Sequence, residues 1–210
     1  MEALGGYPAK SSSHVAMARR FTVLVSVTVG VGCLFLLQAR LLKPKDFYSF
    51  DVKDARGRTV SLERYRGKAS LVVNVASQGE QTEDHYRGLQ DLHRELGTSH
   101  FNVLAFPCGQ FGPGETQRAA WTEEAFAKSA YGVTFPFFSK IKILGSEADP
   151  AFKFLTESAQ KTPKWNFWKF LISPEGKMVR FWRTDEPMES VRKDATALVR
   201  EIILKKRVEL

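Results

Sequence analysis

Residues 71–82 read Leu-Val-Val-Asn-Val-Ala-Ser-Gln-Gly-Glu-Gln-Thr, an apolar run that passes into small and polar residues. A β-branched run without alternation, broken here only by Asn74, is typical of a central strand buried on both faces. The loop after it leads into a predicted helix capped by Thr82. In open α/β sheets ligands gather where strands end and helices begin, because the helix N-terminus offers N–H groups and partial positive charge. A reactive group is therefore expected at position 79, which holds glycine.

The elements around this strand follow from hydrophobic periodicity and turn residues. A β-hairpin turning at Gly57 should precede the strand, and Gly97 should end the helix that begins at Thr82. The other expected elements are a buried strand (101–106), helices at 122–131 and 150–156, a hairpin of strands (168–172 and 178–182), and a last helix with Val191, Ala195, Leu198 and Ile202 on one face. This order predicts a thioredoxin-like α/β sandwich with an extra N-terminal β-hairpin.

The N-terminal region predicts one transmembrane helix ahead of the globular domain. Residues 21–37 carry no charge, and residues 38–42 lengthen the apolar segment toward the roughly 30 Å of a bilayer core. A cleaved signal peptide and a buried soluble helix are the alternatives, and the segment is long for a signal peptide. Basic residues flank both ends, so charge does not decide the orientation. We therefore divide the chain into a flexible tail (1–20), a signal anchor (21–42), a linker (43–46) and one domain (47–210).

Composition narrows the function classes. The 210 residues carry a net charge of +8, but Lys and Arg are spread among acidic residues and no nucleic-acid-binding motif accompanies them, so no nucleic-acid partner is expected. The cysteines are Cys33, inside the predicted span, and Cys108, so an intramolecular disulfide is not expected. The histidines lack metal-ligand spacing, so no metal site is predicted.

Three sequence blocks in order along the chain carry a family resemblance. They are Asn-Val-Ala-Ser (74–77), Phe-Pro-Cys-Gly-Gln-Phe (106–111) and Trp-Asn-Phe (165–167). Together they resemble the signature blocks of the glutathione peroxidases, and the similarity runs from about Phe47 to the C-terminus. The resemblance implies a thioredoxin-like fold and a role in the response to oxidative stress. The anchor and the final Glu-Leu are similar to the endoplasmic-reticulum membrane member, which implies a single-pass type II protein with its domain in the lumen.

The resemblance also implies a chemistry and its residues. A thiolate or selenolate at position 79 would attack a hydroperoxide, and a second thiol would resolve the sulfenic acid. Gln110, Trp165 and Asn166 match the neutral hydrogen-bond donors of the family site, and Cys108 matches the resolving cysteine of some members. No bound cofactor is implied. The co-substrate would be a thiol reductant, either a thioredoxin-like protein or glutathione.

This chain departs from that pattern at Gly79, where the family has its nucleophile, and at Gly109, where the family normally has Asn. Two hypotheses follow. In one, Cys108 supports residual peroxidase activity; in the other, the chain is a catalytically silent module that engages oxidoreductases similar to protein disulfide isomerase through Cys108. The short segment between Ile143 and Trp165 resembles the monomeric members, which favour thioredoxin-like reductants over glutathione.

Overall fold

The computed structural model describes residues 46–79, 81–112 and 120–208, with the backbone alone for residues 120 and 121. The predicted tail, the predicted membrane span and nearly all of the linker lie outside these ranges. No helix within these ranges is both long and apolar enough to cross a membrane.

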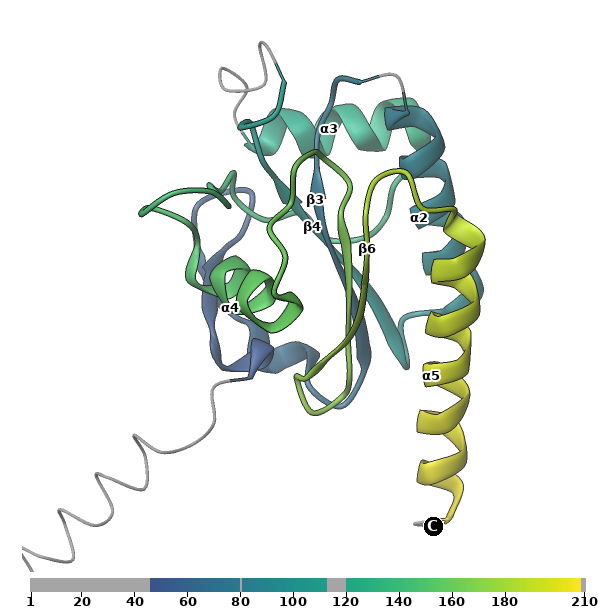
Figure 1. Ribbon diagram of the computed structural model, residues 1–210. Coiled ribbons are helices and arrows are strands. Elements are labelled where there is room, and N and C mark those ends of the chain that lie inside the picture. The colour runs from purple at the N-terminus through teal and green to yellow at the C-terminus, as the bar shows by residue number, and fades with distance from the viewer. Residues whose placement is uncertain (1–45, 80, 113–119, 209–210) are drawn as a thin grey trace, which may run out of the picture. The chain divides into compact units, whose positions relative to one another are not determined.

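A four-stranded sheet in the order β4-β3-β5-β6 forms the centre of the domain (Figure 1). Strand β3 (Ala69–Val75) runs parallel to β4 (Phe101–Pro107) and antiparallel to β5 (Lys169–Ile172). Strand β6 (Met178–Trp182) pairs antiparallel with β5 at the edge. Every residue of β3 and β4 is buried, as the apolar sequence of both strands predicts. The parallel pair brings the carboxyl ends of β3 and β4 to the same edge.

Helices cover both faces of this sheet, and the side chains of β3 alternate between them. Leu71, Val73 and Val75 belong to the apolar core shared with α2 (Thr82–Leu96) and α5 (Met188–Val208). Val72 belongs to the other core, which includes α4 (Pro150–Ala159). In Figure 1, α2 and α5 lie side by side on one side of the sheet, α4 lies on the other, and α3 (Ala120–Tyr131) lies near the start of α2.

The extra N-terminal hairpin is present. Strands β1 (Asp51–Lys53) and β2 (Thr59–Ser61) pair antiparallel around the turn at Gly57. Short 3₁₀ helices flank them at Phe47–Ser49 and Leu62–Tyr65, and they bury Phe47, Tyr48 and Leu62 against the α4 side of the sheet. The architecture is therefore the predicted thioredoxin-like sandwich with an added hairpin.

Helix starts are where the sequence predictions were wrong. Helix α2 has Gln81 at its N-cap, with no side-chain capping bond, and Thr82 is its first residue. Helix α3 begins at Ala120, so Thr122 lies inside it rather than capping it. Helix α4 runs three residues beyond the predicted end, and the Asp149 carboxylate accepts bonds from the N–H groups of Ala151 and Phe152. A polar residue near a helix start is a capping candidate, but tertiary packing decides which candidate takes the cap.

Candidate functional site

A pocket of about 410 Å³ opens at the carboxyl end of β3, next to Gly79. The loop after β3, the first turn of α2, the segment before β5 and the residue Thr184 after β6 form its walls. Its lining is Gln78, Gly79, Gln81, Thr82, His85, Trp165, Asn166, Phe167 and Thr184. The structure thus brings three of the predicted site residues, Gly79, Trp165 and Asn166, to one pocket.

The backbone at Gly79 has a conformation that suits glycine. Its φ is +142°, a region that residues with a side chain rarely occupy. A Cβ added at this position would lie 3.2 Å from Thr82 Oγ1, closer than most Cβ contacts. A cysteine at position 79 would therefore be strained in this backbone conformation.

Asn74 holds the segment that carries Trp165 and Asn166. Its side-chain Nδ2 donates to the Trp165 carbonyl at 3.1 Å, and its Oδ1 accepts from the Trp168 N–H at 3.0 Å. Its backbone carbonyl accepts from the Phe167 N–H at 2.6 Å. Phe167 itself has φ +60°, which is uncommon for a residue with a side chain. The polar interruption of the central strand thus fixes the opposite wall of the pocket.

Three polar side chains that line the pocket have atoms without a hydrogen-bond partner among the described residues. They are Thr82, whose Oγ1 is unpartnered, Asn166, whose Oδ1 is unpartnered, and His85, for which both ring nitrogens are unpartnered. Their exposed fractions are 4%, 2% and 6%. Buried polar atoms are nearly always bonded in native proteins, so the unpartnered atoms of these three lining residues make the pocket a candidate place for a polar ligand.

His85 and Lys169 set the electrostatics behind the pocket wall. The His85 ring stacks on Phe167 with ring centroids 4.6 Å apart. Burial, and secondarily the Lys169 charge, lowers the pKa of His85 to about 4, so its imidazole is neutral at pH 7. Burial lowers the pKa of Lys169 to about 8, with Glu186 and Asp185 opposing the shift, and its Nζ donates to the Phe167 carbonyl at 2.7 Å.

Cys108 and Gln110 follow β4 and do not line this pocket. The Cys108 side chain is 1% exposed and belongs to the apolar core on the α4 side, with Phe106 and Phe138. Gln110 Oε1 accepts from the Ile143 N–H at 2.6 Å and the Leu144 N–H at 3.0 Å, and its Nε2 donates to the Leu144 carbonyl at 3.2 Å. The Gln110 amide is thus bonded to a backbone loop. Phe111, in the same loop as Gln110, contacts the pocket wall: its ring centroid lies 6.3 Å from that of Trp165.

Comparison with known proteins now decides the family. A family model described as "Glutathione peroxidase" matches residues 47–156. This chain belongs to the glutathione peroxidase family. Proteins named "Probable glutathione peroxidase 8" are 74% identical in Tetraodon nigroviridis and 56% identical in Homo sapiens, each alignment covering 100% of both chains. A crystal structure described as Trgpx in apo form has a TM-score of 0.63 at 30% identity, covering 75% of this chain and 97% of that one.

The sequence did not predict four residues that line or support this candidate site. Asn74 was predicted only as an interruption of a strand and as part of the 74–77 block, and the histidines, His85 among them, were considered only as metal ligands. Thr184, whose Oγ1 donates to the Asn166 carbonyl, and Lys169 were not singled out. Two signals could have pointed to Asn74 and His85. Asn74 is a polar residue within an apolar strand, and His85 lies three residues after the helix start.

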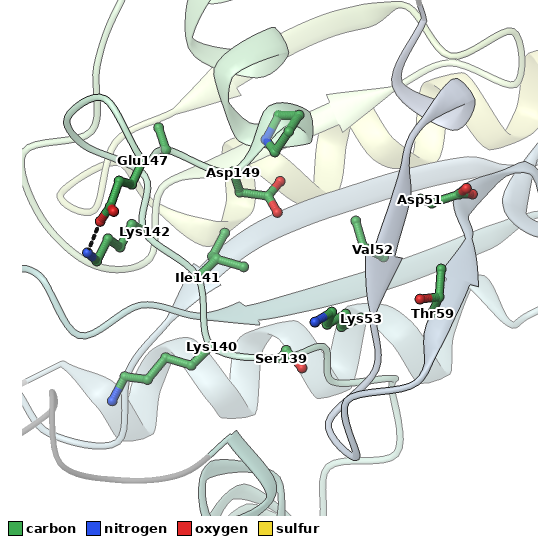
Figure 2. Close-up of a pocket in the computed structure, with 12 residues that line it drawn as sticks. Asp51, Val52, Lys53, Thr59, Ser139, Lys140, Ile141, Lys142, Glu147 and Asp149 are labelled. Carbon is green, nitrogen blue, oxygen red and sulfur yellow. Dashed lines mark hydrogen bonds and ion pairs between the residues drawn. The ribbon is translucent and has the colours of Figure 1, made fainter.

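A second pocket of about 430 Å³ lies between β1 and the segment 139–150, and shares no residue with the Gly79 pocket. Figure 2 shows its lysines and carboxylates, with Lys142 and Glu147 joined in an ion pair. Asp149, at its rim, caps α4, and burial raises the pKa of its carboxyl group. The described residues of its lining include no cysteine or histidine.

Proposed function

We propose that this chain is a thiol peroxidase of the glutathione peroxidase 8 type whose own attack on the hydroperoxide is weak or lost. The observation that carries the proposal is Gly79 at the start of α2, in one pocket with Trp165 and Asn166. Indole and amide groups can hydrogen-bond a peroxide or a thiolate, but glycine has no atom that attacks an O–O bond. The pocket keeps its polar lining and lacks the nucleophile.

The burial of Cys108 argues against its replacing the missing nucleophile. A thiol buried among apolar side chains has its thiolate disfavoured, and reactive cysteines are generally accessible and close to positive charge. Cys108 also lies outside the Gly79 pocket. The same burial hinders a mixed disulfide with an oxidoreductase similar to protein disulfide isomerase, since the partner could reach the thiol only after the loop opens. Engagement of such partners through Cys108 is thus the weaker candidate function.

The cellular setting belongs to this proposal as well. The apolar segment 21–42 and the terminal Glu-Leu support a single-pass protein of the endoplasmic-reticulum membrane with its domain in the lumen. The short segment between Ile143 and Trp165 supports a monomer that takes electrons from a thioredoxin-like protein.

The test compares hydrogen peroxide consumption by three forms of the full chain purified in detergent, with a thioredoxin-like protein as reductant. We expect the natural chain and Cys108→Ser to stay at background and Gly79→Cys to gain roughly 100-fold or more, because it regains a nucleophile. Because position 79 has φ +142°, thermal unfolding of Gly79→Cys is measured alongside. Turnover by the natural chain that disappears in Cys108→Ser would contradict the proposal.

A further inference from the structure

The Gly79 pocket presents unpartnered polar atoms from two sides. Thr82 and His85 come from the first turns of α2, and Asn166 comes from the segment that Asn74 holds. Each of these side chains is more than nine-tenths buried, and in the part of the chain that the structure describes Thr82 Oγ1, both His85 ring nitrogens and Asn166 Oδ1 have no hydrogen-bond partner. They include hydrogen-bond acceptors and, in the neutral imidazole and the hydroxyl, donors. A ligand that both donates and accepts a hydrogen bond fits this lining.

The two helices that begin next to the pockets differ in their caps. Helix α4 has its first N–H groups occupied by the Asp149 carboxylate, whereas the Gln81 side chain makes no capping bond to α2. A helix start without a side-chain cap leaves its partial positive charge available to a ligand with developing negative charge. In the Gly79 pocket this charge adds to the unpartnered side chains.

We propose that the pocket binds a small uncharged thiol, which takes the place of the side chain that position 79 lacks and reduces hydroperoxides there. The inference rests on the proposed function, since it requires that the chain has no effective nucleophile of its own. The thiol sulfur lies beside the start of α2. The S–H group donates to His85, and the hydroperoxide oxygens bond to Asn166 and Trp165.

The chemistry balances with two thiol molecules and one hydroperoxide. The sulfur attacks the terminal peroxide oxygen, an S–O bond forms and the O–O bond breaks, so the sulfur loses two electrons to the peroxide. The thiol proton passes through the His85 imidazole to the departing oxygen, which leaves as water or an alcohol. A second thiol then attacks the sulfenic acid, and a disulfide and water are released.

The lining selects against charged thiols. Among the described residues that line the pocket there is no Asp, Glu, Lys or Arg, so they offer no counter-ion to a carboxylate that loses its hydration there. The residues that flank it include Glu83 and Asp84 in the first turn of α2 and Asp185 and Glu186 after Thr184. These acidic groups disfavour glutathione, which carries two carboxylates, and leave 2-mercaptoethanol as the suitable probe.

The test measures hydrogen peroxide loss by the full chain in detergent as 2-mercaptoethanol is titrated without any protein reductant. We expect a rate that saturates with thiol and exceeds the reaction in buffer by about tenfold or more, since the pocket holds both reactants together. Thioglycolate, a small anionic thiol, should give at most about a tenth of that acceleration, because its carboxylate finds no counter-ion.

A matched pair of variants tests the pocket itself. His85→Phe keeps an aromatic ring against Phe167 but removes both nitrogens, and should lower the saturating rate about tenfold or more. His93→Phe is the control, because His93 is a buried histidine on the same helix, packs on Phe135 and does not line the pocket. Thermal unfolding of both variants separates a lost ligand site from a lost fold.

The outcomes distinguish the inference from the proposed function. A thiol dependence that is linear and equal to that in buffer, or equal rates for His85→Phe and His93→Phe, overturns the thiol site and leaves the proposed function standing. Turnover with the thioredoxin-like reductant alone, lost in Cys108→Ser, overturns the proposed function. Saturable binding of 2-mercaptoethanol by calorimetry without peroxide, absent in His85→Phe, supports the site independently of activity.

Discussion

The loops after β3 and β4 leave the same edge of the sheet but enter different surroundings. The loop after β3 carries Gly79 into a pocket where buried polar atoms of Thr82, His85 and Asn166 have no bonding partner in the described ranges. The loop after β4 carries Cys108 into an apolar core and ties the Gln110 amide to three backbone groups of residues 143 and 144. The first loop thus leads to side chains whose polar atoms have no described partner, whereas in the second loop the Gln110 amide is bonded within the fold.

This difference separates positions that can act on a ligand from positions that hold the structure. Polar groups at functional sites are kept ready for a ligand at some cost in stability, whereas structural polar groups are satisfied internally. By that criterion the pocket at the β3 loop is the candidate site, and the β4 loop is structural. The variants below test the division, from the largest expected effect to the smallest.

Asn74→Ala should lower the free energy of unfolding by about 3 to 4 kcal/mol, because two buried backbone groups of Trp165 and Trp168 lose their partner. Chemical denaturation measures the loss. Asn102→Ala is the control: Asn102 is also a buried asparagine on a strand of the sheet, but its Nδ2 has no partner within the described residues. Equal losses in the two variants would contradict the role of Asn74 as the support of the pocket wall.

Acid should destabilise the protein through His85. Its pKa is about 4 in the folded state against 6.5 for an ordinary histidine, so the unfolded state binds more protons between these values. The stability that the neutral ring contributes is therefore present above pH 6.5 and falls by about 3 kcal/mol as the pH drops to 4. Urea unfolding of the natural chain and His85→Phe between pH 4 and 7.5 should show the stability difference changing by that amount. A difference that stays flat with pH would refute the buried neutral state.

Gln110→Ala should lower the free energy of unfolding by about 1 to 2 kcal/mol, since it removes the hydrogen bonds that hold the loop at Ile143 and Leu144. Thiol-dependent peroxide loss at the Gly79 pocket should stay within a factor of about two, because Gln110 does not line that pocket. Gln90→Ala, which loses comparable bonds to Thr134, is the control for stability. A large rate loss confined to Gln110→Ala would make Gln110 part of the reaction site after all.

Asn166→Ala should have the smallest effect on stability, within about 0.5 kcal/mol, because its Oδ1 has no bond to lose inside the described part of the chain. Its effect should fall on thiol-dependent peroxide loss instead. The two variants should then show opposite patterns: Gln110→Ala lowers the free energy of unfolding, and Asn166→Ala lowers the rate of peroxide loss. A strong destabilisation by Asn166→Ala would remove the distinction drawn between the two loops.

Most of the fold could be predicted from local patterns. The strands predicted from the mainly apolar runs at 71–75 and 101–106 lie within β3 and β4, and the apolar stripe of the last helix lies in α5, because burial leaves such patterns in the sequence. The start of α2 was not predicted correctly, because Thr82 and Gln81 are both plausible near a helix N-terminus and contacts from other segments decide between them.

Three separated blocks determined the family, and the glycine at position 79, where the resemblance places the nucleophile, led to the prediction that the usual nucleophile is missing. Only the tertiary structure decided that Trp165 and Asn166 meet Gly79 in one pocket while Cys108 and Gln110 stand outside it. It also decided that His85 is buried and neutral and that Asn74 holds the opposite wall. The physical reason is that residue types follow from the sequence directly, whereas burial and hydrogen-bond satisfaction depend on segments almost a hundred positions apart, as Asn74 and Trp168 are.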